Sequence, residues 1–143
     1  MSAIGRKKQT WRLQDFESKT DNGRWTRVAG DMLESKAWQQ LTVYEIAVYL
    51  HMKNKFRVKN TGEHNGRDIS FTYNEAVTKL KMGRARFTKT IDTLLAVGLI
   101  DMVEHNPHSP QATIYGFSSR WQLYGTDNFK TQNRVRRRQY TDK

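Results

Sequence analysis

The chain is 143 residues long, which favours one domain with enough residues for a sizeable apolar core. Its 25 Lys and Arg against 14 Asp and Glu give a formal net charge of +11 and an isoelectric point near 10.1, values typical of nucleic-acid-binding domains. The sequence contains no cysteine, which excludes disulfides and cysteine-bound metals and is consistent with a cytoplasmic protein.

Residues 1–24 are polar and basic, and we expect them to form a mobile segment ahead of a folded domain at residues 25–125. No apolar run approaches the roughly 18 residues of a transmembrane helix, and the basic start lacks the apolar stretch of a signal peptide. Residues 25–28 predict a short strand, and residues 31–40 predict a short helix. The inward-facing residues expected in this helix are Met32, Leu33, Ala37 and Trp38.

A longer helix is predicted to begin after Thr42 and to end at about Asn54. Thr42 and Glu45 have the Thr-x-x-Glu spacing of a capping box, in which each side chain accepts a hydrogen bond from the backbone of the other residue. Tyr49 is expected to be a core residue rather than part of a cofactor site. The apolar stripe of this helix is expected to contain Ile46, Ala47, Tyr49, Leu50 and Met52.

Residues 55–67 predict a basic loop. It contains two turn signals, Thr61-Gly62 and Asn65-Gly66, of which Asn65-Gly66 suits a tight hairpin turn that would pair residues 56–58 with residues 69–71. A plain loop without this pairing is the alternative, and the sequence leaves both open.

Residues 72–80 predict a short helix that begins with a second capping box, formed by Thr72 and Glu75. Residues 81–83 break the helical pattern. Met82 is expected to fill the space between this helix and the next as an apolar plug. The apolar face of the short helix is expected to contain Ala76, Val77 and Leu80.

A second helix is predicted at residues 84–97, closed by Gly98, where a left-handed residue is easiest. Its inward face is expected to contain Phe87, Ile91, Leu94 and Leu95, and its outward face Ala85, Arg86, Lys89, Asp92, Thr93 and Ala96. Arg84 and Arg86 stand at the positive end of this helix, where a cation is mildly unfavourable. Their placement is explained if a polyanion binds there, because helix N-termini attract phosphate and arginine reads guanine edges bidentately.

The last regular elements predicted are two strands, residues 99–104 and 112–117, that form a β-hairpin. Residues 68–71 are expected to add a small third strand. Lys and Arg are concentrated in residues 51–89, whereas residues 90–119 contain neither. Such segregation is what a single DNA-facing surface would require.

These residues resemble a known superfamily. The segment LKMGRARF at residues 80–87, followed by VGLID at residues 97–101, resembles the winged-helix DNA-binding superfamily, whose pattern runs Leu-Gly-Ile-Ser-Arg-Ser-Thr-Val/Phe and then Leu-x-x-Gly-Leu-Ile. The segments 32–38 and 119–125 are similar to those of small winged-helix proteins of phages, plasmids and integrative conjugative elements. The resemblance covers about residues 25–130.

The resemblance implies an α+β winged helix-turn-helix, with a three-helix core, a β-hairpin wing, an extra N-terminal helix and a basic C-terminal tail at residues 126–143. It implies a double-stranded DNA-binding protein with the second helix in the major groove. By position, the base contacts would be Arg84, Ala85, Arg86 and Lys89, and the wing would present His105, Asn106, His108 and Ser109. The phosphate contacts expected from charge are Tyr73, Asn74, Lys79 and Lys81 near the helix ends, Lys53, Lys55, Arg57 and Lys59 in the basic loop, and Arg134, Arg136, Arg137 and Arg138 in the tail.

The sequence departs from the family pattern in three ways. Gly83 replaces the serine that caps the second helix, and Lys81 stands where the turn glycine is usual. The wing tip contains no Lys or Arg, which argues against a strong minor-groove insertion. The expected role is a replication or transfer accessory factor, or a transcription regulator, of a mobile element. A second copy of the chain and other proteins of a nucleoprotein complex are the further partners considered, and no membrane is expected.

Two other functions are weighed against DNA binding. The domain could serve as a protein-interaction module whose charge meets an acidic partner, or it could bind RNA through exposed aromatic side chains. An enzyme is not expected, because no paired carboxylates, nucleophile elbow or phosphate-cradling loop occurs. His105 and His108 lack acidic or cysteine companions at fixed spacing, so neither a metal site nor a cofactor is predicted.

Overall fold

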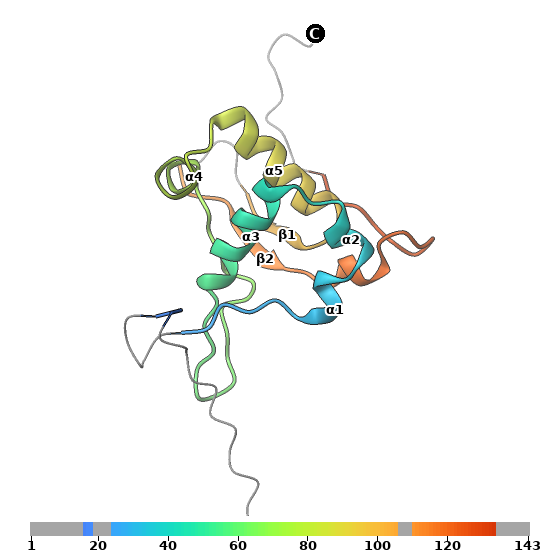
Figure 1. Cartoon of the computed structure of the whole chain (residues 1–143), viewed down its shortest axis with the longest axis horizontal. Coiled ribbons are helices and arrows are strands. Elements are labelled where there is room, and N and C mark those ends of the chain that lie inside the picture. Colours follow the sequence, from blue (N-terminus) through green and yellow to red (C-terminus); the bar gives the residue numbers. More distant parts are fainter. Residues whose placement is uncertain (1–15, 19–23, 106–109, 134–143) are drawn as a thin grey trace, which may run out of the picture.

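The computed structural model describes residues 16–18, 24–105 and 110–133. Within them the chain is a mixed α+β protein in which three helices and an antiparallel hairpin enclose the core (Figure 1). The helices are α1 (Gly30–Leu33), α2 (Lys36–Gln39), α3 (Val43–Asn54), α4 (Tyr73–Leu80), α5 (Arg84–Ala96) and the 3-10 helix η1 (Arg120–Leu123), and the strands are β1 (Ile100–Glu104) and β2 (Ile114–Phe117). None of the helices in the described ranges is long and apolar enough to cross a membrane.

Both predicted capping boxes are confirmed. At the start of α3, Thr42 Oγ1 accepts from the backbone N–H of Tyr44, and Glu45 accepts from the backbone N–H of Thr42. At the start of α4, Thr72 Oγ1 accepts from Glu75 N at 3.2 Å, and Glu75 accepts from Thr72 N at 3.4 Å. Each box satisfies backbone donors that the first helical turn leaves without partners.

The turn between α4 and α5 has the plug that the sequence predicts. Met82 is buried between the helices. Lys81 ends α4 in the left-handed conformation, with φ 53° and ψ 39°. Gly98 follows α5 with φ +86°, and a Cβ atom there would lie 2.7 Å from the backbone nitrogen of Trp121. A glycine is therefore required at the end of α5 both by conformation and by space.

Strands β1 and β2 pair in antiparallel register, from Ile100 opposite Phe117 to Glu104 opposite Ile114, with an irregularity between Met102 and Glu104. Of the third strand predicted at residues 68–71, the structure contains a single bridge. Ile69 and Tyr115 exchange backbone hydrogen bonds of 2.9 and 2.6 Å. The sheet therefore has two strands, and the segment before α4 joins it only at Tyr115 of β2.

The pairing of residues 56–58 with residues 69–71, one of the two alternatives that the sequence left open, does not form. Val58 instead pairs with His64, and the turn falls at Gly62, which has φ +90°. Asn65, expected in the turn itself, braces the start of the loop: its Oδ1 accepts from Arg57 N at 2.7 Å. Gly62, which adopts a positive φ, is the turn residue. Asn65 instead holds the start of the loop through its side chain.

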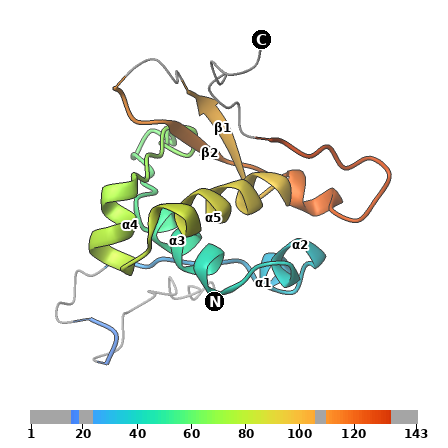
Figure 2. The same cartoon turned by 90° about the horizontal axis from the view of Figure 1, so that it is seen from above.

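Helix α3 lies under α5, and α5 packs on β1 on its other side (Figure 2). The centre of the core contains Tyr49, whose ring meets Trp38 and Phe117 edge to face. Burial raises the pKa of Tyr49 to about 12, so the ring is a neutral core residue, as predicted. The fully buried neighbours include Val48, Met52, Ile69, Ile91, Leu94, Leu95, Leu99 and Ile100.

Several predictions of local structure and burial are wrong. Residues 31–40 form two short helices, because Ser35 Oγ accepts from Trp38 N and begins α2 afresh. Residues 25–28 form no strand. Three residues assigned to inward faces are exposed, namely Leu33, Leu50 and Val77, whereas Val48 is buried. The buried face of α3 therefore includes Val48 together with Tyr49 and Met52, and that of α4 is centred on Ala76.

After β2 the chain folds back over the core, with Trp121 and Tyr124 packed against it. It then continues along the outer edge of β1. Thr131 Oγ1 donates to Ala96 O at 3.0 Å, and Gln132 Oε1 accepts from Met102 N at 2.8 Å. The part of the predicted tail that the structure describes is thus attached to the fold.

Candidate nucleic-acid interface

The four side chains predicted to contact bases all lie exposed on α5: Arg84, Ala85, Arg86 and Lys89. The face of α5 opposite Ala85, Arg86 and Lys89 is buried through Phe87, Ile91, Leu94 and Leu95, whereas Arg84, in the first turn, points to a different side of the helix, toward α4. Gly83 is the N-cap residue, and no side chain caps the helix. The first turn of α5 therefore combines open backbone donors with basic side chains, and it contains no acidic residue.

Both arginines of this turn rest on aromatic rings. The guanidinium carbon of Arg84 lies 4.2 Å from the ring centroid of Tyr73, the first residue of α4. The guanidinium carbon of Arg86 lies 4.4 Å from the ring centroid of Tyr44, in the first turn of α3. A cation on an aromatic face is held without a carboxylate, so its N–H donors stay available for another acceptor.

Glu75 of α4 is directed to Lys55 and Lys79, and Glu45 of α3 accepts from the backbone of Thr42. Within the described residues, the ion pairs are Lys55–Glu75, Lys59–Glu63, Arg67–Asp101, Lys79–Glu75 and Arg120–Asp101. Arg84, Arg86, Lys89 and Lys81 have no ion pair in this part of the chain. Within the described residues, α5 and its preceding turn thus bring together four cations without an ion pair, whereas other cations without one, such as Lys53 and Arg57, lie elsewhere in the fold.

Three predicted phosphate contacts, Lys55, Lys59 and Lys79, make ion pairs, and two of them share Glu75. Glu75 meets Lys55 Nζ at 2.6 Å and Lys79 Nζ at 3.6 Å. Burial raises the pKa of Glu75, but the hydrogen bond and charge of Lys55, with the backbone of Thr72 and the charge of Lys79, outweigh it and hold the pKa below its ordinary value. Lys55 also donates to Ser70 O at 2.5 Å, so it mainly ties α4 to the preceding segment. The neighbouring Asn74 is exposed and Tyr73 is half-buried.

The basic loop does not share a surface with the first turn of α5. Figure 1 shows α5 at the top of the view and the loop around residues 57–65 at the bottom. Arg57 donates to the carbonyl oxygens of Asn54 and Phe56, and Lys59 lies 3.9 Å from Glu63. The charges that cluster in sequence are therefore distributed over two ends of the fold.

Lys53 faces inward from the end of α3. Its Nζ lies 5.1 Å from the ring centroid of Phe56 and 5.3 Å from that of Phe117. Burial and the nearby charge of Arg27 lower the pKa of Lys53. Its side chain covers the underside of the hairpin and is poorly placed to reach a phosphate at α5.

Of the predicted wing residues, the structure describes His105 alone; Asn106, His108 and Ser109 lie outside the described residues, as do Arg134, Arg136, Arg137 and Arg138. His105 Nδ1 and Thr113 Oγ1 are 2.6 Å apart, which joins the two sides of the hairpin. In the described ranges no three His, Asp or Glu side chains gather as a metal site would need.

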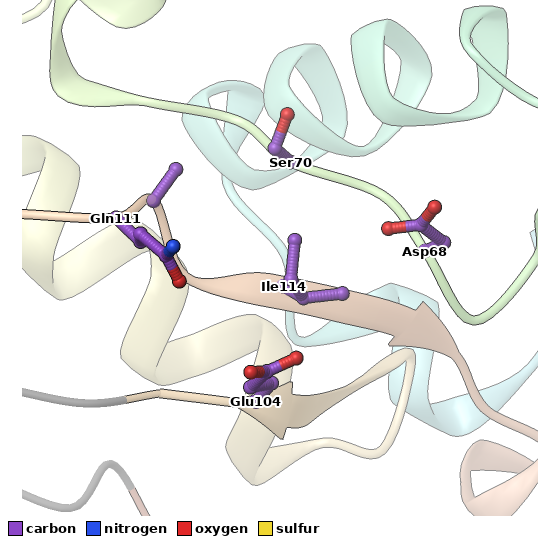
Figure 3. Close-up of a pocket in the computed structure, with 6 residues that line it drawn as sticks. Asp68, Ser70, Glu104, Gln111 and Ile114 are labelled. Atoms are coloured by element: carbon purple, nitrogen blue, oxygen red, sulfur yellow. The ribbon is translucent and has the colours of Figure 1, made fainter.

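A cavity of about 400 Å³ opens beside the hairpin, between the segment before α4 and the start of β2 (Figure 3). Asp68 and Glu104 line it together with Ser70 and Gln111. Two carboxylates and no cation make this edge of the hairpin unfavourable for a phosphate backbone. The electrostatics therefore favour the α5 side over this edge as a polyanion surface.

The sequence analysis missed Tyr44 as a site residue. Its signal was present: each Thr-x-x-Glu box has a tyrosine between its two ends, and that tyrosine falls in the first helical turn. We also compared the chain with protein-family models, curated proteins and solved structures, and none of them matches it. The functional conclusion therefore rests on the residues and their geometry.

Proposed function

We propose that the protein is a winged-helix protein that binds double-stranded DNA. Helices α4 and α5 would form the helix-turn-helix, α3 the supporting helix, and the β1–β2 hairpin the wing. The observation that carries the proposal is that Arg84, Arg86 and Lys89 lie exposed on the first turns of α5 and make no ion pair within the described residues. A helix with one buried apolar face and one exposed cationic face has the width and charge to enter the major groove.

In this proposal each exposed residue of α5 has a role that its chemistry suits. Arg86 and Arg84 would donate bidentately to guanine O6 and N7, and Ala85 would contact a thymine methyl group. Lys89 would reach a further base edge, one turn along the helix. Lys81 and the uncapped amides after Gly83 would contact phosphates, which fix the register without reading sequence.

The biological role that fits such a protein is replication, transfer or transcription control of a mobile genetic element. This part of the proposal comes from the resemblance of the sequence, whereas duplex binding is supported by the arrangement of charges. A second copy of the chain would bind if the DNA site is palindromic.

The first experiment is a gel-shift with random-sequence duplex at low salt, followed by selection of bound duplexes from a random pool. We expect retardation that weakens steeply with salt, because cations that contact phosphates release counterions. Failure to retard any duplex would refute the proposal and favour a protein-interaction module. Preference for single-stranded RNA competitor would favour an RNA-binding protein.

A matched pair of variants locates the surface. Arg86→Ala with Lys89→Ala removes two cations from α5, and Arg57→Ala with Lys59→Ala removes two from the opposite end. We expect the α5 variant to lose most of its affinity for duplex and the loop variant to lose far less. Equal losses would mean that net charge, rather than α5, mediates binding.

A further inference from the structure

The first turns of α3 and α4 are built alike. Each begins with a threonine, ends its capping box with a glutamate, and carries a tyrosine between them: Tyr44 in α3 and Tyr73 in α4. The boxes fix the backbone of each turn, so each tyrosine leaves its helix in a defined direction. Both rings end on an arginine in the first turn of α5.

The two contacts lie on different sides of α5. Arg84 and Arg86 are two residues apart, which separates them by roughly 200° around a helix. Arg84 accordingly reaches the α4 side and Arg86 the α3 side. Tyr44 of α3 and Tyr73 of α4 thus contact the first turn of α5 from two sides. The first turns of the three helices therefore lie close together.

Stacking has a consequence that an ion pair would not have. An arginine side chain loses considerable rotamer freedom when it binds a ligand, and a ring that holds it beforehand reduces that loss. The guanidinium keeps its in-plane N–H donors, because the ring occupies only its face. A guanidinium group held in one orientation can discriminate a guanine edge from other base edges more sharply than a guanidinium group that is free to rotate.

We propose that Tyr44 and Tyr73 are positioning residues that hold Arg86 and Arg84 for base readout, so that sequence preference for guanine-containing duplex depends on the two tyrosine–arginine pairs. The inference rests on the proposed DNA binding. Its readout is the ratio of affinities for the selected and a scrambled duplex, which a purely structural role would leave unchanged.

The test is a double-mutant cycle in the full chain, with dissociation constants measured on both duplexes by fluorescence anisotropy. Tyr44→Leu should lower the preference about two- to fivefold, the range expected for one exposed cation–π contact. In the Arg86→Ala background, Tyr44→Leu should have no further effect. Tyr44→Phe keeps the ring and should retain the preference.

The control combines each tyrosine variant with a variant of the arginine that this tyrosine does not contact. Tyr44→Leu should act independently of Arg84→Ala, whereas Tyr73→Leu should be coupled to Arg84→Ala and independent of Arg86→Ala. Thermal unfolding of each variant checks the fold, most of all for Tyr73, whose ring centroid lies 6.2 Å from that of Phe87.

The outcomes separate this inference from the proposed function. A wild-type chain that binds no duplex refutes the proposed function itself. Duplex binding without enrichment of any sequence, or tyrosine effects that persist after the partner arginine is removed, overturns the inference and leaves DNA binding in place. Loss of preference in Tyr44→Phe would also overturn it, because the ring would then not be what matters.

Discussion

Arg120 and Asp101 join the end of α5 to the hairpin. Arg120 Nε donates to Asp101 Oδ1 at 2.8 Å, while another nitrogen of the same guanidinium donates to the carbonyl oxygens of Leu95 and Ile100 at 3.0 and 2.9 Å. The remaining nitrogen donates to Lys130 O at 2.7 Å. One side chain therefore connects α5, β1 and the segment after η1.

Arg120→Met should lower the free energy of unfolding by about 2–3 kcal/mol, because it leaves carbonyl groups and a carboxylate without their charged donor. Urea unfolding measures the change. Arg67→Met is the matched control: Arg67 meets the other oxygen of Asp101, but its side chain is 55% exposed against 23% for Arg120. We expect less than about 1 kcal/mol there. Equal losses would contradict the assignment of Arg120 as the principal tie.

Acid should destabilise the protein through Asp101 and Glu75. Burial raises the pKa of Asp101, but hydrogen bonds from Arg67 and Arg120 and their charges outweigh it, so the folded-state pKa lies below the ordinary value. A depressed pKa contributes stability that is fully present above the unfolded-state values, about 3.9 for Asp and 4.3 for Glu, and is lost as pH falls through the lower folded-state pKa.

We therefore expect the melting temperature to fall below about pH 4, and Asp101→Asn to be less stable than wild type at neutral pH and to show a smaller further loss in acid. Calorimetry across pH 2 to 7 would check this. A fall of the same size in wild type and Asp101→Asn would show that other groups carry the acid sensitivity.

Lys81→Gly should be more stable than Lys81→Ala by about 1 kcal/mol, because only glycine adopts the left-handed conformation without steric cost. Both variants lose the same charge, so their difference isolates the backbone. Thermal unfolding of the pair is sufficient. If alanine were equally stable, the left-handed geometry of residue 81 would not be a constraint in solution.

Arg86→Ala should reduce discrimination between the selected and a scrambled duplex by about 1–3 kcal/mol, the range for one bidentate arginine contact. Replacement of the arginines at 134, 136, 137 and 138 should instead weaken all duplexes alike and lower the dependence of affinity on salt. Titrations on both duplexes at several salt concentrations distinguish the two effects. Equal losses on both duplexes for Arg86→Ala would remove it from the base-reading set.

Local signals in the sequence were sufficient for the elements that surround α5. The capping boxes at Thr42 and Thr72, the plug at Met82 and the glycine at residue 98 each act through neighbouring residues, and the structure has all of them. Helical periodicity also predicted the exposed residues Ala85, Arg86 and Lys89 of α5, but Asp92, Thr93 and Ala96, expected on the same face, are half-buried.

What depends on distant residues could not be predicted. The sequence shows a basic loop at residues 55–67 but not that Lys55 lies 2.6 Å from Glu75, twenty positions later. It likewise shows Tyr44 and Arg86 without indicating that they stack. Charge counted along the chain overstated the number of cations available to a polyanion, because several of them make ion pairs with carboxylates that are distant in sequence.

The segment around Gln132 lies along the outer edge of β1. The side chain of Gln132 accepts a hydrogen bond from a backbone donor of that strand, so a segment without regular structure, rather than another strand, borders the outer edge of the sheet. Proteolytic loss of the residues beyond Phe129 would uncover a ready template for strand exchange between molecules. Such a shortened chain would self-associate at concentrations where the intact one stays dispersed, and light scattering would register the difference.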